Sequence, residues 1–154
     1  MNKSDTAGVI ARPPLVYLTA RVIGLVASTL VPTPFPPRAL GYPLGAVLVV
    51  IALGLFGSGI RTMGRAGTPV RTSDPTTALV TTGPFRFTRN PVYLSFTLCY
   101  AGIALAARSL WALLLLPVVL VVIQYGVIYR EERYLERRFG VDYVQYRERV
   151  RRWI

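Results

Sequence analysis

The sequence predicts an all-α membrane protein, with about four transmembrane helices and C-terminal amphipathic helices at the membrane surface. Hydrophobic residues make up 53% of the 154 residues, and the mean hydropathy is +0.45. This composition is too apolar for a soluble domain of this size. The chain also contains four apolar runs, each long enough to cross or nearly cross the hydrocarbon core of a bilayer. We expect one membrane-embedded domain over residues 1–154.

The composition also excludes several classes of function. The formal charge of +11 is divided by the apolar runs, which favours membrane topology over a nucleic-acid-binding face, so we expect no nucleic-acid partner. Cys99 is the one cysteine and histidine is absent. An intrachain disulfide is therefore impossible, and we predict neither a metal site nor a Ser/His catalytic pair.

The first apolar run covers residues 15–31. The polar residues before it lack the apolar core of a signal peptide, so we expect this run to be retained as a span. Arg21 lies inside it, near its start. We expect the Arg21 side chain to reach back to the nearer interface, and a functional charge is the alternative. Residues 32–43 are rich in proline and are expected to form a non-helical loop.

The second run covers residues 43–60, where Gly54 and Ser58 have a spacing that permits close contact between helices. A long polar segment follows over residues 61–90. Its glycines and prolines break any helix, and it carries five arginines. A long loop of this kind in a compact protein is usually functional or disordered.

The third and fourth runs cover residues 91–107 and 110–129. Because two residues, Arg108 and Ser109, separate them, we predict a tight antiparallel hairpin. We also expect Pro117 to kink the fourth helix.

The distribution of positive charge predicts the topology. Fifteen of the 18 Lys and Arg residues, Lys3 and Arg71 among them, lie before the first run, in residues 61–90 or after residue 129. By the positive-inside rule both termini are cytoplasmic. The loop 61–90 and the tail 130–154 then share the cytoplasmic face and can meet there.

The end of this loop is the first candidate site. Gly83 and Pro84 form a turn signal, while Asn90 and Pro91 are typical of a helix start, with Asn90 as the cap and Pro91 in the first turn. The free N–H groups of the helix N-terminus, together with the two arginines between these pairs, favour a bound anion. Arginines that merely set membrane topology are the alternative interpretation.

The tail is the second candidate site. Residues 130–139 should continue the fourth helix until Gly140, and a second amphipathic helix is expected over 142–153. Glu131 and Glu132 have no basic neighbour three or four residues away on their own helix. They must find partners elsewhere, either in the arginines of the loop or in a cationic ligand.

Both stretches contain recognisable patterns. The loop contains Gly83-Pro84-Phe85-Arg86 followed by Arg89-Asn90-Pro91-Val92-Tyr93, and the tail contains Arg130-Glu131-Glu132 followed by Leu135, Phe139-Gly140, Tyr143 and Tyr146. Together they resemble the membrane-embedded methyltransferases that include isoprenylcysteine carboxyl methyltransferases and phospholipid methyltransferases. Asn90 departs from this pattern, because the eukaryotic carboxyl methyltransferases have His there.

The resemblance implies S-adenosylmethionine bound between the two motifs on the cytoplasmic side. It implies a lipophilic acceptor from the bilayer, which is an isoprenyl carboxylate, a phospholipid amine or a thiol. The catalytic candidates are Arg130, near the reacting group, and Glu131, which would take a proton from an amine. The cofactor contacts that it implies are Gly83, Pro84, Arg89, Asn90, Pro91, Tyr93, Glu131 and Glu132.

The residues present agree with this chemistry, because methyl transfer from a sulfonium requires alignment and exclusion of water but neither a metal nor histidine. The alternative from another class is a non-catalytic membrane assembly or lipid-binding protein, in which the two motifs only brace the loop against the tail. A transporter that uses Arg21 is weaker, because inverted repeats are not evident.

Overall fold

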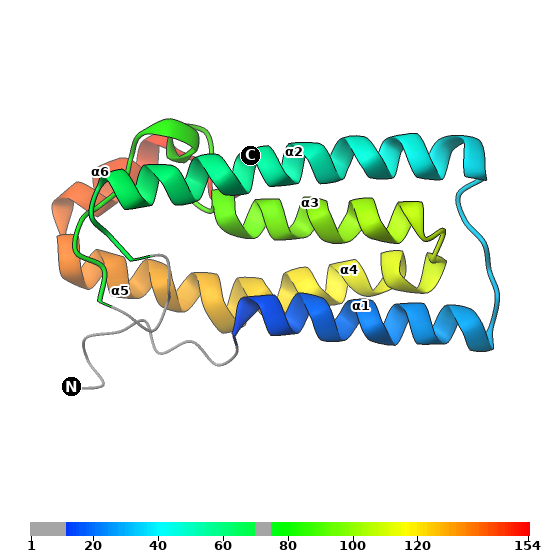
Figure 1. Cartoon of the computed structure of the whole chain (residues 1–154). Coiled ribbons are helices and arrows are strands. Elements are labelled where there is room, and N and C mark those ends of the chain that lie inside the picture. The colour runs from blue at the N-terminus through cyan, green and yellow to red at the C-terminus, as the bar shows by residue number, and fades with distance from the viewer. Residues whose placement is uncertain (1–11, 70–74) are drawn as a thin grey trace.

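The computed structural model describes residues 12–69 and 75–154, and over these ranges it is entirely helical apart from loops. Its elements are α1 (Pro13–Leu30), α2 (Arg38–Arg65), η2 (Gly83–Arg86), α3 (Pro91–Ala106), α4 (Leu110–Ile123), η3 (Gln124–Ile128), α5 (Tyr129–Phe139) and α6 (Val141–Arg149). Figure 1 shows α2 beside α3 and α4 beside α1, with η2, α5 and α6 gathered at one end of the bundle. The all-α prediction is confirmed.

Three helical stretches are long and apolar enough to cross a membrane, namely Pro13–Leu30, Arg38–Arg65 and Leu110–Phe139, and the shorter apolar helix Pro91–Ala106 accompanies them. The chain is thus a polytopic membrane protein. At 1.5 Å per residue, Leu110–Phe139 is about 45 Å long, which exceeds a hydrocarbon core of about 30 Å. Its apolar part ends at Tyr129, and seven of the next ten residues are charged. We therefore treat α5 as lying outside the membrane.

The start of α2 differs from our expectation. The helix begins at Arg38, so residues 38–43, which we expected in a loop, are helical. Pro37 occupies the N-cap, and Pro43 lies in the second turn. Because Pro43 removes just one helical hydrogen bond there, the remaining apolar contacts of α2 can outweigh its cost.

The turn between α3 and α4 is as tight as predicted. Arg108 has a φ of 54°, and its Nε donates to the Pro36 carbonyl at 2.9 Å. Ser109 caps α4 by accepting from the Ala112 N–H at 3.1 Å. The Ser109 hydroxyl also donates to the Gly24 carbonyl at 3.2 Å. This turn thereby joins α1, α4 and the α1–α2 loop at the end of the bundle opposite the charged helices. The expected kink at Pro117 stays a prediction.

The closest approaches between helices involve glycines other than Gly54. A Cβ added to Gly54 would meet nothing within 4 Å. A Cβ added to Gly45 would lie 2.5 Å from the Gly102 carbonyl oxygen, and one added to Gly102 would lie 2.7 Å from the Gly45 oxygen. The backbones of α2 and α3 therefore approach each other at Gly45 and Gly102, and the close contact that the spacing of Gly54 permits does not form among the described residues.

A pair of alanine variants tests this packing. We expect Gly45→Ala to destabilise the fold by about 1–3 kcal/mol, because backbone atoms of α3 would have to move away from the new methyl group. Gly54→Ala is the matched control on the same helix, and it should leave stability unchanged or raise it by up to about 1 kcal/mol through helix propensity. Thermal unfolding in detergent measures both. Equal midpoints for the two variants would contradict the packing.

We expected the Arg21 side chain to reach back towards the start of α1, but it does not. Its guanidinium carbon lies 5.5 Å from the centre of the Tyr100 ring on α3. Its Nε is buried and has no hydrogen-bond partner among the described residues. The aromatic face of Tyr100 attracts this cation into the bundle. Lys3 and Arg71, which entered the topology count, lie outside the described residues, and the orientation of the termini stays a prediction.

Candidate functional site

The loop motif and the tail motif meet at the charged end of the bundle. Tyr93 lies in the first turn of α3 and is 7% exposed. Its hydroxyl donates to Glu131 Oε1 on α5 at 2.6 Å. Because α4, the π-helical η3 and α5 follow one another without a break, a single long helix carries Glu131 from the membrane to this contact. A short π-helical segment often marks a functional site.

Glu132 is enclosed by two arginines. Its Oε1 lies 3.0 Å from Arg89 Nη1 and accepts from Arg152 Nε at 2.9 Å. Its Oε2 accepts from Arg152 Nη2 at 2.7 Å. The side chains of Arg89 and Glu132 are 9% and 10% exposed. Glu132 therefore finds its partners in the loop and the tail of its own chain.

Two guanidinium nitrogens of Arg89, Nε and Nη1, are buried and have no hydrogen-bond partner within residues 12–69 and 75–154. Nη1 still has its ion-pair contact with Glu132, whereas Nε has no such contact among these residues. A buried charged donor without a partner costs free energy, and a bound anion would remove that cost. Its backbone N–H, by contrast, donates to the Arg151 carbonyl at 3.0 Å.

Asn90 does not cap α3, which corrects our expectation. The helix begins at Pro91 as predicted, but the Asn90 side chain makes no cap hydrogen bond. Instead its Nδ2 donates to the Arg152 carbonyl at 3.0 Å. This bond uses the amide nitrogen, whereas a cap would require Oδ1 to accept from an N–H of the first turn, and Oδ1 makes no such bond. The first turn of α3 consequently lacks a side-chain cap, which leaves its positive end available to an anion.

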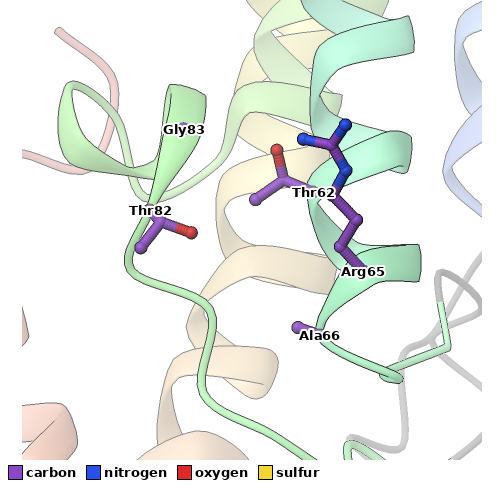
Figure 2. Close-up of a pocket in the computed structure, with 5 residues that line it drawn as sticks. All are labelled: Thr62, Arg65, Ala66, Thr82 and Gly83. Carbon is purple, nitrogen blue, oxygen red and sulfur yellow. The ribbon is translucent and has the colours of Figure 1, made fainter.

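The turn signal at Gly83 is confirmed. Gly83 has a φ of 59°, and a Cβ there would lie 2.6 Å from Thr62 Oγ1. Pro84 beside it is buried. Gly83 lines a pocket of about 390 Å³ together with Thr62, Arg65, Ala66 and Thr82. Figure 2 shows Thr62 on α2 pointing toward the loop that carries Thr82 and Gly83, and the Arg65 side chain extending along α2. The other predicted cofactor residues do not line this pocket.

Burial sets the protonation behaviour of this region. The pKa of Glu131 is raised to about 7, chiefly by desolvation. The hydrogen bond from Tyr93 lowers this pKa, whereas the charge of Glu132 raises it. Desolvation also raises the pKa of Tyr143 to about 12, although Arg89 counteracts it. Glu131 can thus exchange a proton near neutral pH, whereas Tyr143 stays neutral.

Arg130, the other catalytic candidate, is exposed on α5.

Sequence reasoning missed Arg152. We expected a helix over 142–153, but α6 ends at Arg149 and Val150 is extended. The chain beyond it lies against the loop, where the Arg152 carbonyl accepts from Thr88 Oγ1 at 3.1 Å. The sequence contains no signal for these contacts, because they join the Arg152 carbonyl to the side chains of Asn90 and Thr88, which lie 62 and 64 residues away. Among the described residues, no three His, Cys, Asp or Glu lie together as a metal site would require.

Comparisons with known proteins identify the family. The family model for phospholipid methyltransferases matches residues 40–142, about two thirds of the chain. The match includes both motifs up to Asp142 but not the end of the tail. The chain is also 38% identical over 63 residues to an uncharacterized protein of Haemophilus influenzae, which covers 41% of this chain and all of that protein. No solved structure matches. The chain therefore belongs to the phospholipid methyltransferase family of membrane proteins.

Proposed function

We propose that this protein transfers the methyl group of S-adenosylmethionine to a lipophilic acceptor at the cytoplasmic face of the membrane, with both termini on that side. Among the acceptor classes, we favour the amine of a phospholipid. The family match supports this choice. Asn90 supports it too, because it replaces the histidine that the eukaryotic carboxyl methyltransferases have.

One observation carries the proposal, namely the contact between Tyr93 and Glu131. It joins the two motifs through a carboxylate whose pKa is raised to about 7 by burial. Perturbed groups of this kind are frequent in active sites. The pairing of Glu132 with Arg89 and Arg152 leaves Glu131 as the carboxylate of the pair that can take part in chemistry.

The residues around this contact fit the charged parts of S-adenosylmethionine. The uncapped N-terminus of α3 and the unused Arg89 Nε suit its carboxylate. Glu131 suits its ammonium group or its ribose hydroxyls. Gly83, Pro84, Pro91 and Tyr93 would shape the surrounding backbone. We assign Glu132 to holding Arg89 rather than to direct contact, because arginine atoms surround both of its oxygens.

When bound, S-adenosylmethionine would supply an electrophilic methyl group on sulfur. For an amine acceptor, Glu131 takes a proton from the ammonium headgroup and leaves a lone pair on nitrogen. The nitrogen deprotonated in this way would be the acceptor of the methyl group that the bound cofactor supplies. Tyr93 orients Glu131 through its hydroxyl. Arg130 is the candidate for orienting an anionic group of the acceptor.

The rival function is a non-catalytic membrane assembly or lipid-binding protein. The ion pair between Arg89 and Glu132 supports this rival function, because it braces the loop against the tail without any ligand. The two functions differ in whether the protein binds the cofactor and transfers its methyl group.

The test uses purified protein in bicelles that contain phosphatidylethanolamine, with S-adenosylmethionine labelled in its methyl group. We expect label in the lipid extract, and none when phosphatidylcholine, whose nitrogen is fully methylated, replaces that lipid. An isoprenylated cysteine and a lipophilic thiol are assayed in parallel. Label on one of these instead would retain the methyltransferase and reject the phospholipid amine. Label on none, with no binding of S-adenosylhomocysteine, would favour the non-catalytic function.

A further inference from the structure

The segment of residues 150–154 follows α6 and lies beyond the part of the chain that matches the family model. It nevertheless contacts the loop motif and the tail motif at once. We propose that Arg152 is a positioning residue of the cofactor site, which holds Arg89 and the start of α3 in the geometry that receives the cofactor's carboxylate. This inference rests on the proposed function.

The side chain of Arg152 holds Glu132 in place. It binds both oxygens of Glu132, at 2.9 and 2.7 Å, and its guanidinium carbon lies 4.5 Å from the centre of the Tyr129 ring. A bidentate pair fixes the orientation of a carboxylate better than a single contact does. Glu132 is in turn the group that holds Arg89. The side chain of Arg152 therefore fixes Arg89 through Glu132.

The backbone of the same segment binds the loop before α3. The Arg151 carbonyl accepts from the Arg89 N–H at 3.0 Å. The Arg152 carbonyl accepts from Thr88 Oγ1 and Asn90 Nδ2 at 3.1 and 3.0 Å. These bonds hold the three residues that immediately precede α3. The segment thereby keeps the uncapped start of α3 and the unused Arg89 Nε in fixed positions.

An indole anchors the segment to the long helix. Trp153 Nε1 donates to Gln124 Oε1 in η3 at 3.0 Å. The segment is thus attached at three places, namely to η3, to α5 and to the loop before α3. An alternative arrangement, in which the segment only covers the site and competes with the cofactor, makes the opposite prediction, because removing Arg152 would then strengthen cofactor binding.

The test compares Arg152→Gln with Arg149→Gln in the full chain. Arg149 is an exposed residue in the last turn of α6, so this control removes the same charge three residues earlier. We measure the affinity for S-adenosylhomocysteine by calorimetry, and kcat and KM for S-adenosylmethionine with the acceptor at saturation. We expect Arg152→Gln to raise KM and Kd by about 10-fold or more, as loss of one charge-assisted hydrogen bond does. The value of kcat should change less than about threefold, because Arg152 does not touch the reacting atoms.

Three results would overturn the inference. They are unchanged or tighter binding in Arg152→Gln, an equal loss in Arg149→Gln, and a change confined to kcat. Arg152→Lys, which keeps the charge but not the bidentate pair, should recover part of the affinity. If Arg152→Gln does not fold, Trp153→Phe takes its place, and we expect a smaller rise in KM from the loosened segment, with no rise contradicting the inference. Failure of the wild-type protein to bind S-adenosylhomocysteine would instead reject the proposed function.

Discussion

Replacing Glu131 with glutamine should lower kcat for methyl transfer to an amine by about 10²–10⁴-fold, the usual contribution of a general base. Glutamine has nearly the shape of glutamate, so it can still accept the hydrogen bond from Tyr93, but it cannot take a proton from the ammonium headgroup. The variant should therefore remain folded while losing activity. Single-turnover transfer of labelled methyl to phosphatidylethanolamine measures the effect without interference from product release.

The pH dependence separates this loss from a general defect. Because the pKa of Glu131 is raised to about 7, a rising fraction of the carboxylate is ionised as pH increases through 7, and the wild-type rate should increase over that interval. The residual rate of Glu131→Gln should lack this step. Glu148→Gln, an exposed change on α6, serves as the control and should retain both rate and step. A Glu131→Gln variant that keeps the wild-type rate would reject Glu131 as the base.

Replacing Glu132 with glutamine should produce the largest loss of stability. The change leaves the buried Arg89 guanidinium without its carboxylate, and breaking one side of a buried ion pair typically costs about 3–5 kcal/mol. It also removes the bidentate partner of Arg152, which releases the segment 150–154 from α5. Thermal and urea unfolding in detergent, followed by circular dichroism, measure the loss.

The same helix offers a matched control. Glu136 pairs with Arg147 at 2.8 Å, but these side chains are 41% and 39% exposed. Exposed pairs are worth about 0–1 kcal/mol. Glu136→Gln should therefore lower stability by no more than this amount. Equal losses for the two glutamine variants would mean that burial of the Arg89–Glu132 pair does not hold the loop against the tail.

The sequence predicts most of the fold because the signals involved are local. Long apolar runs predict the helices, and the two residues between the third and fourth runs predict a tight turn. The start of α2 is harder to predict, because a single proline in a helix costs little when tertiary contacts compensate for it. The approach at Gly45 depends on which face of α2 meets α3. Gly41 and Gly45 share the spacing of Gly54 and Ser58, but the predicted second run begins at residue 43 and therefore leaves Gly41 out.

The candidate site shows the same division. Glu131 and Glu132 lack partners on their own helix, so the sequence correctly indicates that they pair elsewhere, and the structure brings them to Tyr93 and Arg89. The sequence does not indicate which acid pairs with which group. The role of Arg152 could not be predicted, because it combines a side-chain pair with Glu132, 20 residues away, with bonds to a backbone carbonyl beyond the end of α6. Side-chain patterns in the sequence carry no information about that carbonyl.

The measurement that tests the central claim most directly is calorimetric titration of the detergent-purified protein with S-adenosylhomocysteine, in parallel with Glu131→Gln and Asn90→Ala. We predict binding to the wild-type protein that both variants weaken, the first by loss of a carboxylate and the second by loss of a contact that positions the loop before α3. Absence of binding to a wild-type protein whose helical circular dichroism is intact would contradict the methyltransferase function.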